Sequence, residues 1–150
     1  MTPVLTKPSK HVLLVEDNDN DAELTLGMLK KCLPDIDVDV VRDGEEALDY
    51  LHRRGDYATR SAVNPVLVLL DLKMPKVNGV EVLSDVKSNQ QLKSIPVVML
   101  TSSREAQDLR ECYRLGANGY VVKPVDAKHF TQAITNIGAY WAVTNEPPPL

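Results

Sequence analysis

The sequence has few of the features that assign a chain to a class at first sight. Its 150 residues include only two cysteines, Cys32 and Cys112, which lie far apart and form no CxxC pair. We therefore expect two small buried thiols rather than a disulfide or a metal site. No apolar run approaches the roughly 18 residues of a membrane helix, and residues 1–10 lack an apolar core of signal-peptide length. These absences favour a reducing, cytoplasmic setting without membrane contact.

Positive charge is in slight deficit as well. The formal net charge is −4 and the isoelectric point is about 5.3, and no block of like charge stands out. Pairs such as Lys30–Lys31 and Arg53–Arg54 are ordinary solvated side chains. This balance gives no electrostatic case for binding nucleic acid. The length suits a single domain with one sizeable core.

What the sequence does have is a regular alternation of short apolar runs and segments of helical periodicity. Such alternation is typical of an α/β fold, in which a parallel sheet is covered by helices on both faces. In the helix before the last strand we expect Ala106, Leu109 and Tyr113 to be buried. The five predicted strands span residues 11–15, 38–41, 66–70, 97–100 and 120–122.

The two ends and one loop depart from this alternation. Residues 1–10 predict an N-terminal arm, and the proline-rich residues 143–150 predict an extended C-terminal tail, so that the folded domain spans 11–142. We expect no second domain after the fifth strand. The connection over residues 54–65 is polar and longer than usual. We interpret it as a solvent-exposed, tolerated insertion, with a partner-contacting loop as the alternative.

Chemically useful side chains follow four of the predicted strands directly. Glu16 and Asp17 follow the first strand, Asp71 the third, Thr101 the fourth and Lys123 the fifth. Because the carboxyl ends of parallel strands meet at one edge of a sheet, we expect these groups to lie together. Each alone is weak evidence, since an Asp in such a place is more often a turn or a helix cap. Together, in order and at the same end of different strands, they indicate a functional site.

This set of residue types suits phosphoryl chemistry on Mg²⁺. The ion prefers oxygen ligands and usually takes one or two carboxylates, here Asp17 and Asp71, with Glu16 bound directly or through water. A carboxylate can also form an aspartyl-phosphate, which makes Asp71 the candidate nucleophile. The charge on the transferred oxygens would be neutralised by Mg²⁺, by the Lys123 ammonium and by the Thr101 hydroxyl with nearby backbone N–H groups.

Four segments of the chain form a recognisable set, namely VLLVED at 12–17, LLDLKMP at 69–75 with Gly79, PVVMLTS at 96–102 and GANGYVVKP at 116–124. They resemble the receiver domain of two-component response regulators, and the likeness covers about residues 10–142. It implies a flavodoxin-like (βα)5 fold with a doubly wound parallel sheet in the strand order 2-1-3-4-5. It also implies that Asp71 accepts a phosphoryl group from a phosphohistidine on a sensor histidine kinase.

The resemblance assigns further roles residue by residue. Asp17 and Asp71 would be direct Mg²⁺ ligands with the backbone carbonyl of Lys73, and Glu16 would complete the acidic pair. A receiver is a phosphoacceptor rather than an enzyme in the ordinary sense, and it would promote its own phosphorylation and slow hydrolysis. The remaining matches are Thr101 as the hydroxyl switch residue, Tyr120 as the aromatic switch residue, Lys123 as the phosphoryl-binding lysine, and a cis Lys123–Pro124 bond.

A narrower likeness concerns three other segments, EDNDNDAE at 16–23, RRGDYA at 53–58 and GAYW at 138–141. They are similar to the small response regulators that partner cyanobacterial and bacterial phytochromes, which consist of a receiver alone and are commonly dimeric. Ile137, Tyr140 and Trp141 would form an apolar patch, and we expect a homodimer through this face, with core packing of Trp141 as the alternative. A phytochrome-type kinase is then the expected partner, and the downstream protein target is open.

Departures from the family pattern lead to one further hypothesis and two rival functions. Lys73 and Ser103 lie two positions after Asp71 and Thr101. We expect them to set the lifetime of the phosphoryl group, with Lys73 pairing either with Glu16 or with that group.

One rival function is that of a constitutive dimerising or docking module with a vestigial site. The other is an aspartyl-phosphate phosphohydrolase, which Lys73 disfavours because such an enzyme needs a second Asp at that position.

Overall fold

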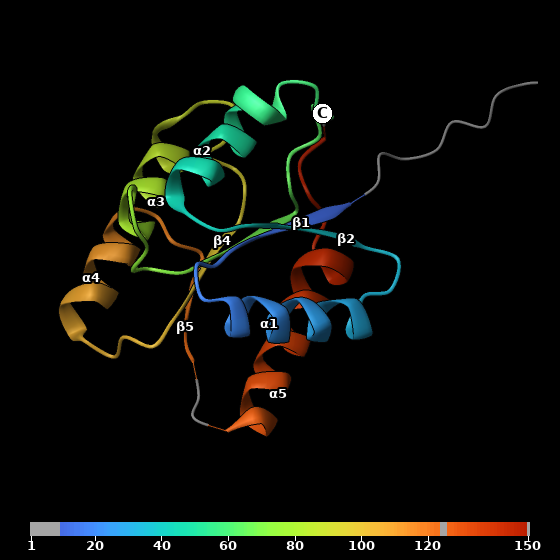
Figure 1. The fold of residues 1–150 in the computed structure, drawn as a ribbon, viewed down its shortest axis with the longest axis vertical. Coiled ribbons are helices and arrows are strands. Elements are labelled where there is room, and N and C mark those ends of the chain that lie inside the picture. The colour runs from blue at the N-terminus through green and yellow to red at the C-terminus, as the bar shows by residue number, and fades with distance from the viewer. Residues whose placement is uncertain (1–9, 124–125, 150) are drawn as a thin grey trace, which may run out of the picture.

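The computed structural model describes residues 10–123 and 126–149, which form one sheet flanked by helices (Figure 1). All five strands are parallel, in the order β2-β1-β3-β4-β5, so the predicted flavodoxin-like fold is confirmed. The strands are β1 (His11–Val15), β2 (Asp37–Val41), β3 (Leu67–Leu70), β4 (Val97–Thr101) and β5 (Gly119–Val122). Each agrees with its predicted range to within one residue at either end.

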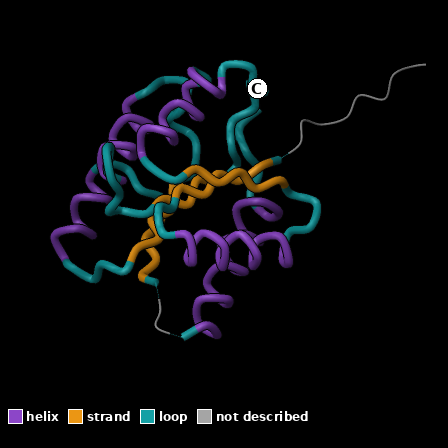
Figure 2. Tube along the Cα trace, viewed as in Figure 1, coloured by secondary structure: helices purple, strands orange, loops and turns teal. Residues whose placement is uncertain are grey.

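Helices cover both faces of this sheet (Figure 2). One core lies between the sheet and the pair α1 and α5, and the other lies between the sheet and α2, α3 and α4. Because the inner strands are covered on both sides, β1, β3 and β4 are buried along their whole length, and they are apolar except for His11 and Thr101. The helices are α1 (Asp19–Cys32), α2 (Gly44–His52), α3 (Gly79–Ser88), α4 (Ala106–Arg114) and α5 (Ala127–Gly138).

Side-chain caps fix where several helices begin. The carboxamide oxygen of Asn18 accepts a hydrogen bond from the Asp21 N–H at 2.9 Å at the start of α1. Asn78 does the same for the Glu81 N–H at 3.0 Å at the start of α3. Such caps stabilise a helix by about 1 kcal/mol each. They set the first turns of α1 and α3 beside the ends of the strands that precede them, β1 and β3.

The predicted burial of α4 is only partly right. Leu109 is half-buried, but Ala106 and Tyr113 are exposed, and the fully buried side chain of this helix is Cys112. The helix lies toward the end of the sheet and contacts α3 and β5. Only a narrow stripe of side chains on α4 is therefore buried against these neighbours. The periodicity of the sequence cannot tell which of two adjacent stripes on the helix is the buried one. Both cysteines are free thiols, Cys112 buried and Cys32 half-buried.

The long connection after α2 is anchored to that helix by side-chain contacts. It is exposed along most of its length and contains a 3-10 turn, η1 (Gly55–Tyr57). The guanidinium of Arg60 lies 4.3 Å from the Tyr50 ring centroid and donates to the Tyr50 carbonyl at 3.0 Å. The Tyr57 hydroxyl donates to Glu46 at 2.6 Å. The predicted exposure of the loop is thus confirmed, and these contacts hold it against α2.

The C-terminal region stays helical slightly longer than predicted. After α5 the chain continues in a π-helical segment, η2 (Ala139–Thr144), two residues beyond the expected end of the domain at 142. Ala142 packs in the same core as α1 and α5, which accounts for this extension. Residues 146–149 have no regular structure, as expected for a tail. Among the described residues, no helix has the length and apolar character needed to cross a membrane.

Candidate functional site

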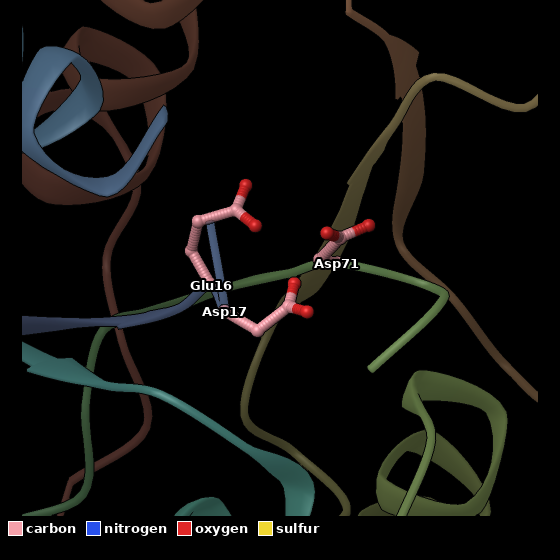
Figure 3. Close-up of side chains that lie close together, drawn as sticks. All are labelled: Glu16, Asp17 and Asp71. Carbon is pink, nitrogen blue, oxygen red and sulfur yellow. The ribbon is translucent and has the colours of Figure 1, made fainter. Parts of the chain in front are cut away.

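Three carboxylates meet at the carboxyl edge of the sheet (Figure 3). Glu16 and Asp17 follow β1 and Asp71 follows β3, and these two strands are hydrogen-bonded neighbours with Val15 opposite Leu70. One oxygen of each carboxylate lies within 4.8 Å of the others. Glu16 is buried, Asp17 is exposed and the Asp71 side chain is 12 % exposed. The predicted meeting of these residues is confirmed.

Gly79 allows the start of α3 to lie against the Asp71 backbone. Its N–H donates to the Leu72 carbonyl at 2.8 Å. A Cβ atom at this position would lie 2.2 Å from the Asp71 carbonyl oxygen, which is far inside van der Waals contact. The Asp71 N–H in turn donates to the Val15 carbonyl at 3.1 Å. Asp71 is thus held between β1 and α3, and only glycine permits the closeness of α3.

Lys123 extends into this cluster from the end of β5. Its N–H donates to the Thr101 carbonyl at 2.7 Å, which holds the residue at the same edge of the sheet. The ammonium forms a short hydrogen bond with Glu16 Oε1 and lies 3.6 Å from Asp71 Oδ2. The Lys123 side chain is only 14 % exposed, so these charges interact with little screening from solvent.

The burial of this group of charges shifts the pKa values of two members. Burial raises the pKa of Glu16, the hydrogen bond and charge of Asp71 raise it further, and Lys123 opposes them. Burial alone would lower the pKa of Lys123, but its hydrogen bonds and charges with Glu16, Asp71 and Asp21 outweigh burial and raise that pKa. The lysine is therefore held as a cation facing an excess of negative charge.

Asp21 is a member of the site that the sequence did not reveal. Its Oδ2 accepts a hydrogen bond from Lys123 Nζ at 3.0 Å. The sequence around Asp21 is typical of residues that cap a helix, and its partner Lys123 is 102 positions away in the chain. The available signal was its place in the first turn of the helix that follows the acidic end of β1.

Thr101 and Tyr120 are joined through Ser103. Thr101 ends β4, next to β3, and its hydroxyl accepts from the Ser103 N–H at 3.3 Å. The Tyr120 hydroxyl donates to the Ser103 carbonyl at 3.0 Å, and burial raises the pKa of Tyr120. The Ser103 hydroxyl donates to Asp108 in α4 at 2.5 Å. The two predicted switch residues thus contact the same short segment between β4 and α4.

The other predicted site residues are less closely involved. Lys73 is exposed in the β3–α3 loop, and the Glu16 carboxylate takes Lys123 as its ion-pair partner instead of Lys73. The prediction that Lys73 pairs either with Glu16 or with the phosphoryl group stays a prediction. The predicted cis bond between Lys123 and Pro124 lies outside the described residues.

The predicted apolar patch near the end of the chain is partly exposed. Tyr140 is 50 % exposed and Val143 is 64 % exposed. Ile137 and Trp141 are half-buried and pack against the core between the sheet and α1 and α5. The Trp141 ring meets Tyr140 edge-on at 4.8 Å between centroids. Tyr140 and Val143 therefore offer more free surface than Trp141 does.

The donor set fits a hard divalent cation. Carboxylate oxygens are the ligands that Mg²⁺ prefers, and three carboxylates so close together repel one another unless a cation compensates. The cluster at Glu16, Asp17 and Asp71 therefore has the chemistry of a metal site.

The known proteins that this chain resembles are response regulators. Residues 12–135 match the response regulator receiver domain family. Response regulator Rcp1 of Synechocystis sp. is 37 % identical over 139 residues, covering 93 % of each chain. The structure of its Mn²⁺-bound form matches with a TM-score of 0.86 over 93 % of this chain and 99 % of that one.

Two further structures are similar. The phosphorylated cyanobacterial phytochrome response regulator RcpA is 39 % identical, with a TM-score of 0.87 over 95 % of this chain and all of that one. The bacteriophytochrome response regulator RtBRR is 57 % identical, with a TM-score of 0.76 over 95 % of this chain and 86 % of that one.

Proposed function

This chain belongs to the family of response regulator receiver domains, which are signalling proteins rather than conventional enzymes, and from that premise we propose that Asp71 is the phosphoacceptor of a two-component phosphorelay. The donor is a phosphohistidine on a sensor histidine kinase. The observation that carries the proposal is the meeting of Asp71 with the acidic pair Glu16 and Asp17 and with Lys123 at one edge of the sheet.

In the proposed reaction an oxygen of the Asp71 carboxylate attacks the phosphorus atom. The P–N bond to the kinase imidazole breaks, and its electron pair stays on the nitrogen. Lys123 supplies positive charge to the phosphoryl oxygens from its position 3.6 Å from Asp71. The Thr101 hydroxyl, on the neighbouring strand end, supplies a hydrogen bond. These groups act mainly by positioning and by neutralising charge, which is what phosphoryl transfer requires.

Asp17 and Asp71 would hold Mg²⁺ directly, with the Lys73 backbone carbonyl as a third ligand and Glu16 bound through water. When bound, the ion neutralises charge on the transferred phosphoryl group. The Mn²⁺-bound form of Rcp1 supports a divalent ion in this family. Glu16 also serves as the buried anion that fixes Lys123 within reach of Asp71.

The same site would operate a conformational switch. Attraction of the Thr101 hydroxyl to the new phosphate breaks its hydrogen bond with Ser103, and the segment that also binds Tyr120 is released. The signal is read on the face formed by α4, β5 and α5. Lys73 and Ser103 set the lifetime of the phosphoryl group, Lys73 by its charge and Ser103 by holding the start of α4 through Asp108.

The names of the similar proteins support a more specific setting. RcpA is a phytochrome response regulator and RtBRR a bacteriophytochrome response regulator. The proposed donor is therefore a phytochrome-type kinase in the cytoplasm. The folded receiver extends to the end of η2 at Thr144, and it forms a homodimer through the patch at Ile137, Tyr140 and Trp141.

A constitutive docking module with a vestigial site is the alternative. The full set of Asp17, Asp71, Thr101 and Lys123 weighs against it, because a module that only docks does not need four chemically matched strand ends. An aspartyl-phosphate phosphohydrolase is also disfavoured. Such an enzyme needs an Asp as general acid two positions after the nucleophile, and this chain has Lys73 there.

Incubation with Mg²⁺ and a small phosphodonor such as acetyl phosphate tests the proposal. Intact mass spectrometry should show the addition of one phosphoryl group in the native chain and none in Asp71→Asn. The Asp56→Asn variant, which changes an exposed Asp on the η1 turn, should accept the group normally. No mass gain in the native chain would leave the docking module as the better account.

A further inference from the structure

Lys123 makes its closest contacts with residues other than the phosphoacceptor. Its ammonium donates to Glu16 and to Asp21 Oδ2 at 3.0 Å, whereas Asp71 Oδ2 lies at 3.6 Å. The last distance allows an ion pair but is too long for a hydrogen bond. In this state two of the three ammonium protons are committed elsewhere.

The two competing carboxylates differ in character. Glu16 is buried beneath the site and belongs to the acidic pair. Asp21 stands on α1, its side chain is 41 % exposed, and it lies outside the cluster of Glu16, Asp17 and Asp71. Asp21 lies in the first turn of α1, a position that favours acidic side chains. Asp21 therefore draws Lys123 toward α1.

A phosphoryl group on Asp71 changes this balance. It places anionic oxygens near an ammonium that lies closer to Asp21, at 3.0 Å, than to Asp71, at 3.6 Å, and charge-assisted hydrogen bonds to those oxygens attract Lys123 away from Asp21. Asp21 is fixed in the first turn of α1, so its hydrogen bond with Lys123 weakens as the ammonium turns to the phosphoryl oxygens. Resting on the proposed function, we propose that Asp21 is a positioning residue that competes with the phosphoryl group for Lys123 and slows phosphorylation of Asp71.

The proposal predicts different effects on the two directions of the reaction. Transfer to Asp71 starts from the resting state, where Lys123 must leave Asp21. Hydrolysis starts from the phosphorylated state, where Lys123 has already moved. Asp21→Asn should therefore raise the maximal phosphorylation rate with a small phosphodonor about threefold, the value of a half-exposed ion pair. The rate of dephosphorylation should be unchanged.

Three comparisons separate this effect from a general change of charge. Glu23→Gln removes an exposed carboxylate from the same helix and should leave the maximal rate unchanged. Asp21→Glu keeps a carboxylate within reach of Lys123 and should restore the native rate. If removal of the Asp21 charge merely reduced repulsion of an anionic phosphodonor, KM would change and the change would diminish at high salt. Competition for the largely buried Lys123 ammonium changes the maximal rate instead, and that change persists at high salt.

Affinity for beryllofluoride, measured by calorimetry in Mg²⁺, gives a readout that involves no chemical step. Asp21→Asn should bind it about threefold more tightly, since the same competition is removed. An unchanged or lower phosphorylation rate in a folded Asp21→Asn protein would overturn the proposal. If the native chain itself gained no phosphoryl group, the proposed function would fail instead, so that the two failures are distinguishable.

Discussion

At the scale of single residues, the site is a place where negative charge exceeds positive charge. Lys123 faces the carboxylates of Glu16, Asp21 and Asp71, and Asp17 lies in the same cluster. The excess is unfavourable in a partly buried setting and makes the folded state receptive to a divalent cation. The stability of the protein should therefore depend on Mg²⁺.

Added Mg²⁺ should raise the free energy of unfolding of the native chain. The gain should reach about 1.4 kcal/mol when free Mg²⁺ is tenfold above its dissociation constant, because a ligand that binds only the folded state stabilises it. Urea denaturation with and without the ion measures the gain. It should vanish in Asp17→Asn and in Asp71→Asn but persist in Glu23→Gln, where an exposed carboxylate outside the cluster is changed. Equal gains in all four proteins would place the ion elsewhere.

The two thiols should differ sharply in reactivity. Cys112 has no exposed surface, and burial raises the pKa of its thiol to about 11. A thiol-reactive dye at pH 8 should modify Cys32, which is half-buried, and should reach Cys112 only after unfolding. Peptide mass spectrometry identifies the modified residue.

The raised pKa of Cys112 also predicts the sign of a pH effect. The folded state keeps the thiol protonated where the unfolded chain has already ionised, so its contribution is complete below pH 9 and is lost as the pH rises toward 11. Between those values the native chain should lose about 1 to 2 kcal/mol more stability than Cys112→Ala does. Parallel pH profiles for the two proteins would be inconsistent with this assignment.

At the scale of elements, the junction between β3 and α3 is the most constrained part of the site. Gly79→Ala should lower the free energy of unfolding by about 2 to 4 kcal/mol, since its Cβ would strike the Asp71 backbone. Gly27→Ala is a matched control in α1, where a Cβ atom meets nothing within 4 Å. That change should stabilise the protein by about 1 kcal/mol because alanine favours the helix. Thermal or urea denaturation distinguishes the two.

The sequence predicts some elements well because local pattern decides them. The apolar runs before Asp17 and Asp71 form buried strands of the expected length, and parallel pairing then brings the two carboxylates together. Two kinds of feature could not be predicted. The buried stripe of α4 depends on which neighbour covers it, so the predicted burial of Ala106 and Tyr113 was wrong, although that of Cys112 was right. For contacts between distant parts of the chain, such as Asp21 with Lys123, the local pattern places Asp21 near the acidic end of β1 but does not identify its partner.

At the scale of the whole molecule, the exposed end of the last helical region bears on self-association. Tyr140→Ser combined with Val143→Ser should weaken the proposed dimer at least tenfold, because these side chains hold most of the exposed apolar surface there. Sedimentation equilibrium measures the change. Leu24→Ser, an exposed apolar side chain on α1, is the matched control and should leave the dimer intact. A dimer unaffected by the double change would move the interface to another surface.

Trp141 adds a complication that the structure explains. It packs against the core between the sheet and α1 and α5, so Trp141→Ala should reduce stability as well as any dimer affinity. Loss of dimer in that variant alone would not identify an interface. Tyr140 and Val143 are the better probes because their removal leaves the core untouched.

The parallel sheet also gives the molecule two unlike poles. The strand ends that carry the site lie at the carboxyl edge of the sheet. Pro65 and Pro96 precede β3 and β4 at the amino edge, and they line a groove there together with tail residues Pro147, Pro148 and Pro149. A fluorophore or a surface tether attached after the tail would therefore stand away from Asp71. The tail is therefore a suitable attachment point for single-molecule measurements. The edge of the sheet that carries Asp71 would stay accessible to a phosphodonor in an immobilised protein.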